Sequence, residues 1–304
     1  MPLVVEEPLV MRTRAWADYA LLDRGGGRKL ERFGPYRVVR PEPQCVWTPT
    51  DAAAWDRADA AFDPSVSEDD EAGRWRFRRE GEPGPFPLVW GGVRFKGRFT
   101  AFRHLGFFPE QAANWGWLDG AVRAMPRGAK VLNLFGYTGV ASLVCAAAGA
   151  AVTHVDASKR AVGWARENAA LSGMEALPTR WIVEDAKKYV GREVRRGSRY
   201  HGIILDPPKY GRGPGGETWR LFEDLPGMLS DCAALLEPEA GFLLLNGYAE
   251  RLSGLSLAHA LSGALGGRGG PVEWGELALE EERNGRAVGL SFFARWTAQE
   301  AAGK

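Results

Sequence analysis

Residues 131–139 read Val-Leu-Asn-Leu-Phe-Gly-Tyr-Thr-Gly, an apolar run that ends in two glycines. A strand that is buried on both faces has such a run. The small-residue stretch 140–148 follows directly and predicts a helix. Strand, glycine turn and helix form the first unit of a nucleotide-binding α/β domain. In that unit the glycines let the backbone approach a ligand at the carboxyl end of the strand.

The chain downstream repeats this unit. Strands are predicted at 151–156, 180–185, 201–206 and 241–247, each followed by a helical stretch, and the helix over 217–236 is interrupted at Pro226. Two last strands, 272–279 and 287–296, are joined at Asn284-Gly285, a favoured hairpin turn. A parallel sheet closed by an antiparallel hairpin is typical of class I S-adenosylmethionine (SAM) methyltransferases. A dinucleotide-binding domain would instead continue with parallel units and usually carry Gly-x-Gly-x-x-Gly.

The first part of the chain has a different character. It is rich in Trp, Pro, Gly and Arg and shows little helical periodicity. Arg74, Arg76 and Arg78 alternate with Trp75 and Phe77, which predicts a strand with cations on one face and rings on the other. We expect this strand to form a hairpin with 88–90. The sequence thus predicts a smaller β-rich substrate-recognition domain over 1–113 and a Rossmann-like methyltransferase domain over 114–304.

Composition restricts the partners and the location. The 304 residues carry a formal net charge of +1, so only a local patch could hold a nucleic acid. The one strong local excess is segment 74–103, with eight Lys or Arg and two acids, 8 − 2 = +6. It is either a solvated strand face or an RNA-contacting surface. Three separated cysteines and the lack of a long apolar run predict a cytoplasmic protein without metal or membrane contact, whose oligomeric state stays open.

Acidic residues end three of the predicted strands. Asp156 lies 20 residues after Gly136, where an acid binds ribose hydroxyls in a mononucleotide unit. Asp185, with Ala186, is expected beside an adenine and can also cap the next helix. Asp206 opens the tetrapeptide Asp-Pro-Pro-Lys. In an open α/β sheet the ligand lies outside these strand ends.

The tetrapeptide 206–209 is suited to bind a planar group that carries several hydrogen-bond donors, such as a base or its amine. Prolines cannot donate backbone hydrogen bonds, so the carbonyls around Pro207 are expected to remain as acceptors next to the Asp206 carboxylate. Tyr210 could stack on a base. Four glycines between 211 and 216 predict a mobile loop that closes over a substrate. The alternative is a rigid strand exit followed by a disordered loop.

Four motifs occur in a fixed order: Asn-Leu-Phe-Gly-Tyr-Thr-Gly (133–139), His-Val-Asp-Ala-Ser (154–158), Glu-Asp-Ala (184–186) and Asp-Pro-Pro-Lys (206–209). This set resembles the bacterial class I SAM-dependent rRNA methyltransferases, a group that includes the large-subunit rRNA cytosine-C5 enzyme. Segment 106–111 is similar to the one that helps close the cofactor site in that family. The resemblance implies SAM bound by Gln111, Asn133, Phe135, Gly136, Tyr137, Thr138, Gly139, Asp156, Ala157, Ser158, Asp185, Ala186 and Asp206. It implies catalysis and substrate binding by Asp206, Pro207, Lys209 and Tyr210.

One departure affects the expected chemistry. Cytosine C5 is a weak nucleophile and needs a thiolate that adds to the ring. The fourth and fifth strand ends read Asp-Pro-Pro-Lys and Leu-Asn-Gly-Tyr, without a cysteine. Cys145 and Cys232 fall in predicted helices, and Cys45 lies in the other domain. We therefore expect methylation at a nitrogen, which needs only in-line positioning against the methyl group.

Three alternatives stay open at this point. The substrate could be a protein or a small molecule, which the near-neutral net charge favours. The chain could bind SAM without turnover. A nicotinamide-dependent dehydrogenase is the remaining case, and nicotinamide binding without SAM binding would establish it.

Overall fold

The computed structural model describes residues 1–65, 72–238, 241–248 and 252–298. The chain forms two compact units. Unit 1 comprises Met1–Met11, Ala113–Leu277 and Leu290–Lys304, and unit 2 comprises Arg12–Ala112 and Ala278–Gly289. The chain passes from unit 2 to unit 1 between residues 112 and 113, next to the boundary expected from the sequence. Two segments depart from a single division at that point. Residues 1–11 belong to unit 1 although they precede unit 2 in the sequence, and residues 278–289 belong to unit 2 although they follow most of unit 1.

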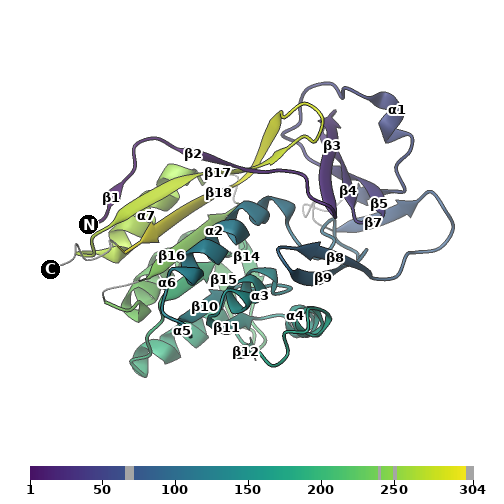
Figure 1. Ribbon diagram of the computed structural model, residues 1–304. Helices are drawn as coiled ribbons and strands as arrows, with labels where there is room; N and C mark the ends of the chain where they lie inside the picture. The colour runs from purple at the N-terminus through teal and green to yellow at the C-terminus, as the bar shows by residue number, and fades with distance from the viewer. Residues whose placement is uncertain (66–71, 239–240, 249–251, 299–304) are drawn as a thin grey trace. The chain divides into compact units, whose positions relative to one another are not determined.

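Unit 1 is organised around a mixed nine-stranded sheet (Figure 1). Its order is β1-β17-β18-β16-β13-β10-β11-β12, with β2 also beside β17. The neighbours among β10, β11, β12, β13 and β16 are parallel, whereas β18 is antiparallel to β16. This arrangement confirms the Rossmann-like fold with a closing hairpin. The strands are β1 Leu3–Val4, β2 Leu9–Thr13, β10 Lys130–Leu134, β11 Ala151–Asp156, β12 Thr179–Val183, β13 Gly202–Leu205, β16 Phe242–Gly247, β17 Pro271–Glu280 and β18 Ala287–Thr297.

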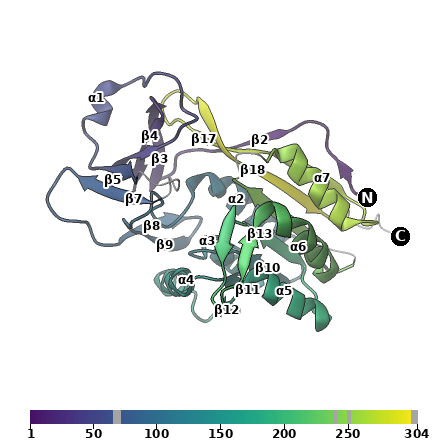
Figure 2. The ribbon, with the colours of Figure 1, turned by 180° about the vertical axis from the view of Figure 1, so that it is seen from behind.

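Helices cover both faces of this sheet because its strands are apolar on both sides. Four consecutive residues of β13 and all six of β16 are buried. The helices α5, α6 and α7 lie in line on one face (Figure 2), where Tyr189, Leu229 and Leu261 join one core cluster. The helices are α2 Ala112–Arg123, α3 Val140–Ala147, α4 Lys159–Leu171, α5 Ala186–Arg195, α6 Leu221–Leu235 and α7 Gly254–Leu265.

The helix predicted over 217–236 is shorter than expected and is not interrupted. It begins at Leu221, because residues 218–220 form strand β15, and it continues through Pro226 to Leu235. Pro226 is the sixth residue of α6, so its missing N–H costs only one hydrogen bond near the start of the helix. Helix α6 therefore forms a continuous support behind β13 and β16.

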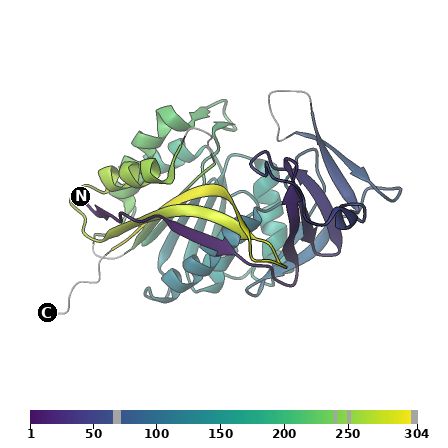
Figure 3. The ribbon, with the colours of Figure 1, turned by 90° about the horizontal axis from the view of Figure 1, so that it is seen from above.

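The N-terminal strands complete one edge of the unit 1 sheet. Strands β1 and β2 both pair with β17, and Figure 3 shows β2 beside the hairpin of β17 and β18. The fit at Gly275 is close, since a Cβ atom there would lie 1.8 Å from the Leu9 carbonyl oxygen. The first eleven residues thus belong to the sheet that carries the parallel strands.

Unit 2 is β-rich, as the sequence predicted. A five-stranded sheet has the order β3-β4-β5-β6-β7, and β8 and β9 form a separate pair. The elements are β3 Tyr19–Gly25, β4 Arg28–Phe33, β5 Tyr36–Pro41, α1 Ala52–Trp55, β6 Ala60–Pro64, β7 Gly73–Phe77, β8 Phe86–Trp90, β9 Val93–Gly97 and a 3₁₀ turn, η1, at Pro109–Gln111.

The hairpin expected between the strand at 74 and residues 88–90 is wrong. Strand β7 pairs with β6, and β8 pairs with β9. Gly91 and Gly92 explain the difference, because both have positive φ (54° and 88°) and form a two-residue turn directly after β8. A local turn of this kind closes a hairpin more readily than the long Pro/Gly segment before β8.

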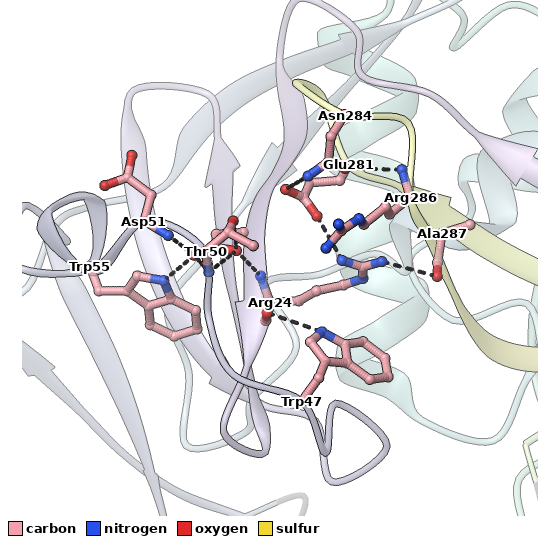
Figure 4. Close-up of polar contacts among 10 residues, drawn as sticks. Arg24, Trp47, Thr50, Asp51, Trp55, Glu281, Asn284, Arg286 and Ala287 are labelled. Carbon is pink, nitrogen blue, oxygen red and sulfur yellow. Dashed lines mark hydrogen bonds and ion pairs between the residues drawn. The ribbon is translucent and has the colours of Figure 1, made fainter.

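A buried polar network holds segment 278–289 within unit 2 (Figure 4). The Arg24 guanidinium donates to the Glu281 carboxylate at 2.6 Å and to the Ala287 carbonyl at 3.4 Å. Next to it, Asp23 accepts hydrogen bonds from Thr50 and from the Trp55 indole, the latter at 2.7 Å. Because the side chains of Arg24 and Glu281 are only 5% and 2% exposed, each charge depends on the other.

Candidate functional site

The parallel strands of unit 1 end along one edge of the sheet. Strand β10 pairs with β11 on one side and with β13 on the other, with Leu134 opposite Val155 and Leu205. The chain moves outward from β10 to β11 and β12 and then returns to β13, so β10 and β13 enclose the topological switch point. Ligands of open α/β sheets bind at such a point. The loop after β10 and the exit of β13 are therefore side by side.

The loop after β10 has an unusual backbone. Phe135 and Tyr137 have positive φ angles of 57° and 49°, and Gly139 has φ 81°. Side chains other than glycine rarely adopt this region, and such strain concentrates at functional sites. At Gly136 a Cβ atom would lie 2.4 Å from the His154 ring, and at Gly139 it would lie 2.7 Å from Ala165 Cβ. The two glycines of the motif are thus required by close packing beneath the loop.

A buried polar cluster supports this loop, and two of its members, Ser142 and His154, were not predicted from the sequence. Asn133 Nδ2 donates to Ser142 Oγ at 2.8 Å, and Ser142 Oγ lies 3.0 Å from His154 Nδ1. Burial lowers the pKa of His154 to about 3, so its ring is neutral. Two features of the sequence could have indicated these two residues. His154 is a histidine within an apolar strand, and Ser142 is a serine within a helix of small apolar residues. Asn133 is 2% exposed, so its side chain supports the loop from below.

Asp156 connects two backbone segments at the end of β11. Its carboxylate accepts from the Tyr137 amide at 2.9 Å and from the Ser158 amide at 2.8 Å. Burial raises the pKa of Asp156, and these two hydrogen bonds oppose the rise. Ser158 caps α4 by accepting from the Ala161 amide. A carboxylate can accept about four hydrogen bonds, so Asp156 retains capacity for a hydroxyl donor.

Asp185 lies at the end of the neighbouring strand β12. It is 5% exposed and caps α5, since its Oδ1 accepts from the Lys188 amide at 3.0 Å. The predicted cap is thus confirmed, and Ala186 begins the helix as a buried residue. The segment after β13 passes close by, because a Cβ atom on Gly213 would lie 3.0 Å from Asp185 Cβ.

Asp206 follows β13 directly. Its amide points to the Leu134 carbonyl at 3.4 Å, next to Phe135. Pro207 is buried, whereas Lys209 and Tyr210 are exposed. The expectation that the carbonyls around Pro207 remain available as acceptors is wrong for Pro208, whose oxygen accepts from the indole Nε1 of Trp219 at 2.7 Å. Trp219 was not predicted from the sequence. It is 2% exposed, and its ring centroid lies 4.9 Å from that of Phe135.

The glycine-rich stretch after Tyr210 is not an irregular loop. Residues Tyr210–Arg212 and Thr218–Arg220 form β14 and β15, a short antiparallel hairpin. Large apolar side chains are exposed after several strand ends of the parallel sheet, at Val183, Tyr210 and Tyr248. Exposed apolar groups next to polar strand ends are a common feature of binding sites.

Two predicted contact regions belong to unit 2. Gln111 ends η1 and is 6% exposed, so its expected contact with the cofactor stays a prediction. In segment 74–103 the alternation along β7 is confirmed, because Arg74 and Arg76 are exposed while Trp75 and Phe77 are partly buried. Arg76 forms an ion pair with Asp63. Whether the segment binds RNA stays a prediction.

The three cysteines are buried and free. Burial raises the pKa of Cys145 to about 12 and of Cys45 to about 11, and it raises the pKa of Cys232 further. Such thiols resist ionisation, and none of them follows β13 or β16. This geometry lacks the thiolate nucleophile that cytosine C5 would require.

A family model supplies the identification. The model of the S-adenosylmethionine-dependent methyltransferases matches residues 44–246, about two thirds of the chain. The chain belongs to this family. It is an enzyme that uses SAM as its methyl donor, and the strained glycine loop with acids at the adjacent strand ends fits a nucleoside-containing cofactor.

Solved structures agree with this assignment. A SAM-dependent methyltransferase from Agrobacterium tumefaciens is 50% identical, with a TM-score of 0.93 over 98% of this chain and 96% of the other. A Streptococcus mutans structure of the same class shares the fold at 17% identity, with a TM-score of 0.70 over 93% of this chain and 75% of the other.

Curated relatives carry ribosomal RNA in their names. The ribosomal RNA large subunit methyltransferase K/L of Shewanella frigidimarina is 31% identical over 157 residues, or 51% of this chain. The ribosomal RNA large subunit methyltransferase I of Aeromonas salmonicida is 35% identical over 106 residues, or 34% of this chain. The matched regions cover only 21% and 26% of these two relatives.

Within the ranges that the structure describes, no helix combines the length and apolar character needed to cross a membrane. No group of three His, Cys, Asp or Glu suited to a metal ion occurs in the same ranges.

Proposed function

We propose that this methyltransferase modifies a base in RNA, with ribosomal RNA as its substrate, and that the methyl group goes to a nitrogen. The observation that supports this proposal most is the position of Asp206 and Pro207 beside the loop after β10 at the switch point. The exposed Tyr210 follows three residues after Pro207. The rRNA methyltransferases among the relatives support the RNA substrate. The high pKa of the buried cysteines supports a nitrogen over cytosine C5.

The cofactor assignments follow the strand ends. The backbone of Phe135, Gly136, Tyr137, Thr138 and Gly139 would hold the cofactor, with Asn133 beneath. Asp156, with Ala157 and Ser158, would hold the ribose, and Asp185 with Ala186 the adenine. Gln111 is assigned to closing the site. When bound, SAM supplies an electrophilic methyl group on its sulfonium.

The chain's own residues then orient the target base. The Asp206 carboxylate and the Pro207 carbonyl accept hydrogen bonds from an amine of the base, which directs the nitrogen lone pair toward the methyl group. Tyr210 stacks on the base, and Lys209 contacts a phosphate. Transfer forms the N–C bond, breaks the S–C bond and leaves a proton on the nitrogen. The Asp206 carboxylate accepts that proton.

Asp206→Asn tests this assignment, because it keeps the shape but removes the charge and half of the acceptor capacity. We expect kcat to fall about 100-fold, since orientation and proton acceptance are both impaired, while the Kd of S-adenosylhomocysteine stays within about threefold. The assay uses labelled SAM and rRNA from a strain that lacks the gene, with nucleoside mass spectrometry. Asp119→Asn on α2 is the control. Full activity of Asp206→Asn, or label only in protein, metabolites or 5-methylcytosine, contradicts the proposal.

Segment 74–103 of unit 2 is proposed to contact the RNA backbone. Exposed arginines on β7 and after it support this role, together with the local charge excess. Each phosphate contact contributes about 0.7 to the salt slope for a single strand. The double variant Arg74→Gln/Arg78→Gln is therefore expected to lower the slope of log Kd against log salt by about 1.4. Arg195→Gln/Arg196→Gln at the end of α5 is the control, and equal slopes for wild type and Arg74→Gln/Arg78→Gln contradict the role.

The location proposed for the enzyme is the cytoplasm. Its cysteines are free and buried, as in proteins from a reducing compartment. Localisation of a tagged chain by microscopy tests this, and signal outside the cytoplasm contradicts it.

A further inference from the structure

The hairpin of β14 and β15 presents one side to solvent. Tyr210 pairs with Arg220, and Arg212 pairs with Thr218, across the two strands. These four residues are exposed, whereas Trp219 is buried and Gly211 is half-buried between them. Alternation along a strand places the four exposed side chains on a common face. We call this the outer face of the hairpin.

Several contacts fix the hairpin at the strand exit. Trp219 donates to the Pro208 carbonyl, and its ring lies against Phe135. The Leu221 amide donates to the Lys209 carbonyl at 3.1 Å. On the other side, Lys187 on α5 donates to the Thr218 carbonyl at 3.1 Å. These inner contacts attach the hairpin to the segment that follows Asp206.

The chemistry of the outer face is aromatic and cationic. Tyr210 on this face is 51% exposed, and Phe222, which lies outside the face at the start of α6, is 55% exposed. The Arg212 Nε donates to the Tyr210 hydroxyl at 3.2 Å, so a guanidinium lies beside this ring. Exposed rings next to guanidinium groups are how proteins bind single-stranded nucleic acid, by stacking on bases and contacting phosphates.

The nearby acids are largely engaged by lysines of α5. Glu217 forms an ion pair with Lys188 at 3.3 Å, and Asp224 forms one with Lys187 at 2.8 Å. Glu223 faces Arg220 at 3.3 Å, in a pair whose side chains are 66% and 60% exposed. Exposed pairs of this kind contribute little, so a phosphate can replace Glu223 as the partner of Arg220.

We propose that the outer face, together with the exposed Phe222 at the start of α6, binds the single-stranded nucleotides that flank the target base. Arg212 and Arg220 would contact phosphates, and Phe222 would stack under a neighbouring base. This inference rests on the proposed RNA function and deepens it. It assigns the substrate as an unpaired RNA segment, because a stacked platform cannot reach bases inside a duplex.

Binding of a fluorescent single-stranded RNA 12-mer to the full chain, saturated with S-adenosylhomocysteine, tests the proposal. For Arg212→Gln/Arg220→Gln we expect Kd to rise about tenfold and the salt slope to fall by about 1.4, from two lost phosphate contacts. Phe222→Ser should weaken binding further. A duplex of the same sequence should bind the wild type weakly and be insensitive to these changes.

Arg195→Gln/Arg196→Gln is the matched control. Arg196 forms an i,i+3 ion pair with Glu193 and is 60% exposed, like Arg220 with Glu223. Wild-type affinity in the Arg212/Arg220 variant, or an equal loss in the control, overturns the inference, as does equal loss on duplex RNA. A different result would contradict the proposed function itself, namely that the wild type transfers no methyl group to RNA. If the variants impair methylation of a protein and leave RNA binding intact, the face binds a protein instead.

Discussion

At the scale of single residues, the loop after β10 combines strain with tight packing. Phe135 and Tyr137 adopt positive φ, and the amide of Tyr137 is held by Asp156. The His154 ring fills the space where a Gly136 side chain would be. A strained backbone persists only where its surroundings fix it, and here a buried Asn133–Ser142–His154 cluster does so.

Gly136→Ala should disrupt this loop. The new Cβ would lie 2.4 Å from His154 Cε1, so the ring or the loop must move. Overpacking of this kind costs about 1–3 kcal/mol. We expect the Kd of S-adenosylhomocysteine, measured by calorimetry, to rise at least about tenfold.

Gly163→Ala provides the matched control, because a Cβ there has no neighbour within 4 Å and the residue is an exposed position of α4. It should leave binding unchanged and stabilise the helix by about 0.5–1 kcal/mol. Wild-type affinity of Gly136→Ala would show that the loop does not bind the cofactor.

At the scale of elements, the short β14–β15 hairpin links the two halves of the site. Trp219 touches both the Pro208 carbonyl and the Phe135 ring. We therefore regard Trp219 as a positioning residue, since it acts through the backbone of the Asp206–Pro208 exit and not on a substrate. Its effect should appear in turnover more than in cofactor affinity.

Trp219→Phe removes the indole donor and keeps an aromatic ring. We expect kcat to fall about tenfold, because the Pro207–Pro208 segment loses the hydrogen bond that orients it. The Kd of S-adenosylhomocysteine should change less than about threefold. Steady-state kinetics and calorimetry measure the two quantities.

Trp274→Phe is the corresponding control. Its indole also donates to a backbone carbonyl, that of Val5 at 2.7 Å, but at the N-terminal edge of the sheet. A general loss of stability would lower the activity of both variants equally. That result would contradict the positioning role proposed for Trp219.

At the scale of the whole molecule, each unit has its own set of buried charges. In unit 2, Glu31 is fully buried, and Arg40 donates to both of its carboxylate oxygens at 2.8 Å. Burial alone would raise the pKa of Glu31. The charges of Arg40 and Lys29 and the hydrogen bonds from Arg40 and Tyr19 outweigh burial and lower it to about 2. Unit 2 therefore depends on an ionised carboxylate inside its sheet.

This lowered pKa predicts acid sensitivity. A carboxyl whose folded pKa lies below its unfolded pKa stabilises the fold above the unfolded value, and the stabilisation is lost as the pH falls toward the folded value. Between pH 4.5 and about 2, unit 2 should lose about 3 kcal/mol from Glu31. Hydrogen exchange of peptides from β3, β4 and β5 measures the loss.

Two variants separate this cause from general acid denaturation. Glu31→Gln/Arg40→Met should flatten the pH dependence of exchange in these peptides, because no buried carboxylate remains at that position. Asp63→Asn/Arg76→Gln removes an exposed pair of the same unit and should leave the dependence as in the wild type. An unchanged slope in Glu31→Gln/Arg40→Met would exclude Glu31 as the cause.

The sequence determined the parts of this protein that follow from local pattern. Apolar runs between glycines, prolines and acids predicted the inner parallel strands such as β13 and β16, since burial on both faces leaves no other composition. The dipeptide Asn284-Gly285 predicted the closing hairpin. Gly285 has positive φ (69°), but the turn is longer than two residues, because the Glu281 amide donates to the Arg286 carbonyl across it. The strand-end acids indicated a nucleoside ligand, because parallel strands end at one edge.

Tertiary structure determined which partner each local element takes. Strand β7 pairs with β6, residues 1–11 join the edge of the unit 1 sheet, and segment 278–289 joins unit 2. His154, Ser142 and Trp219 became site residues only through contacts between different elements of the fold. Periodicity indicates whether a side chain is buried, but it does not indicate which residues that side chain packs against. Pairing and packing partners are selected by the free energy of the whole fold, so no local pattern contains them.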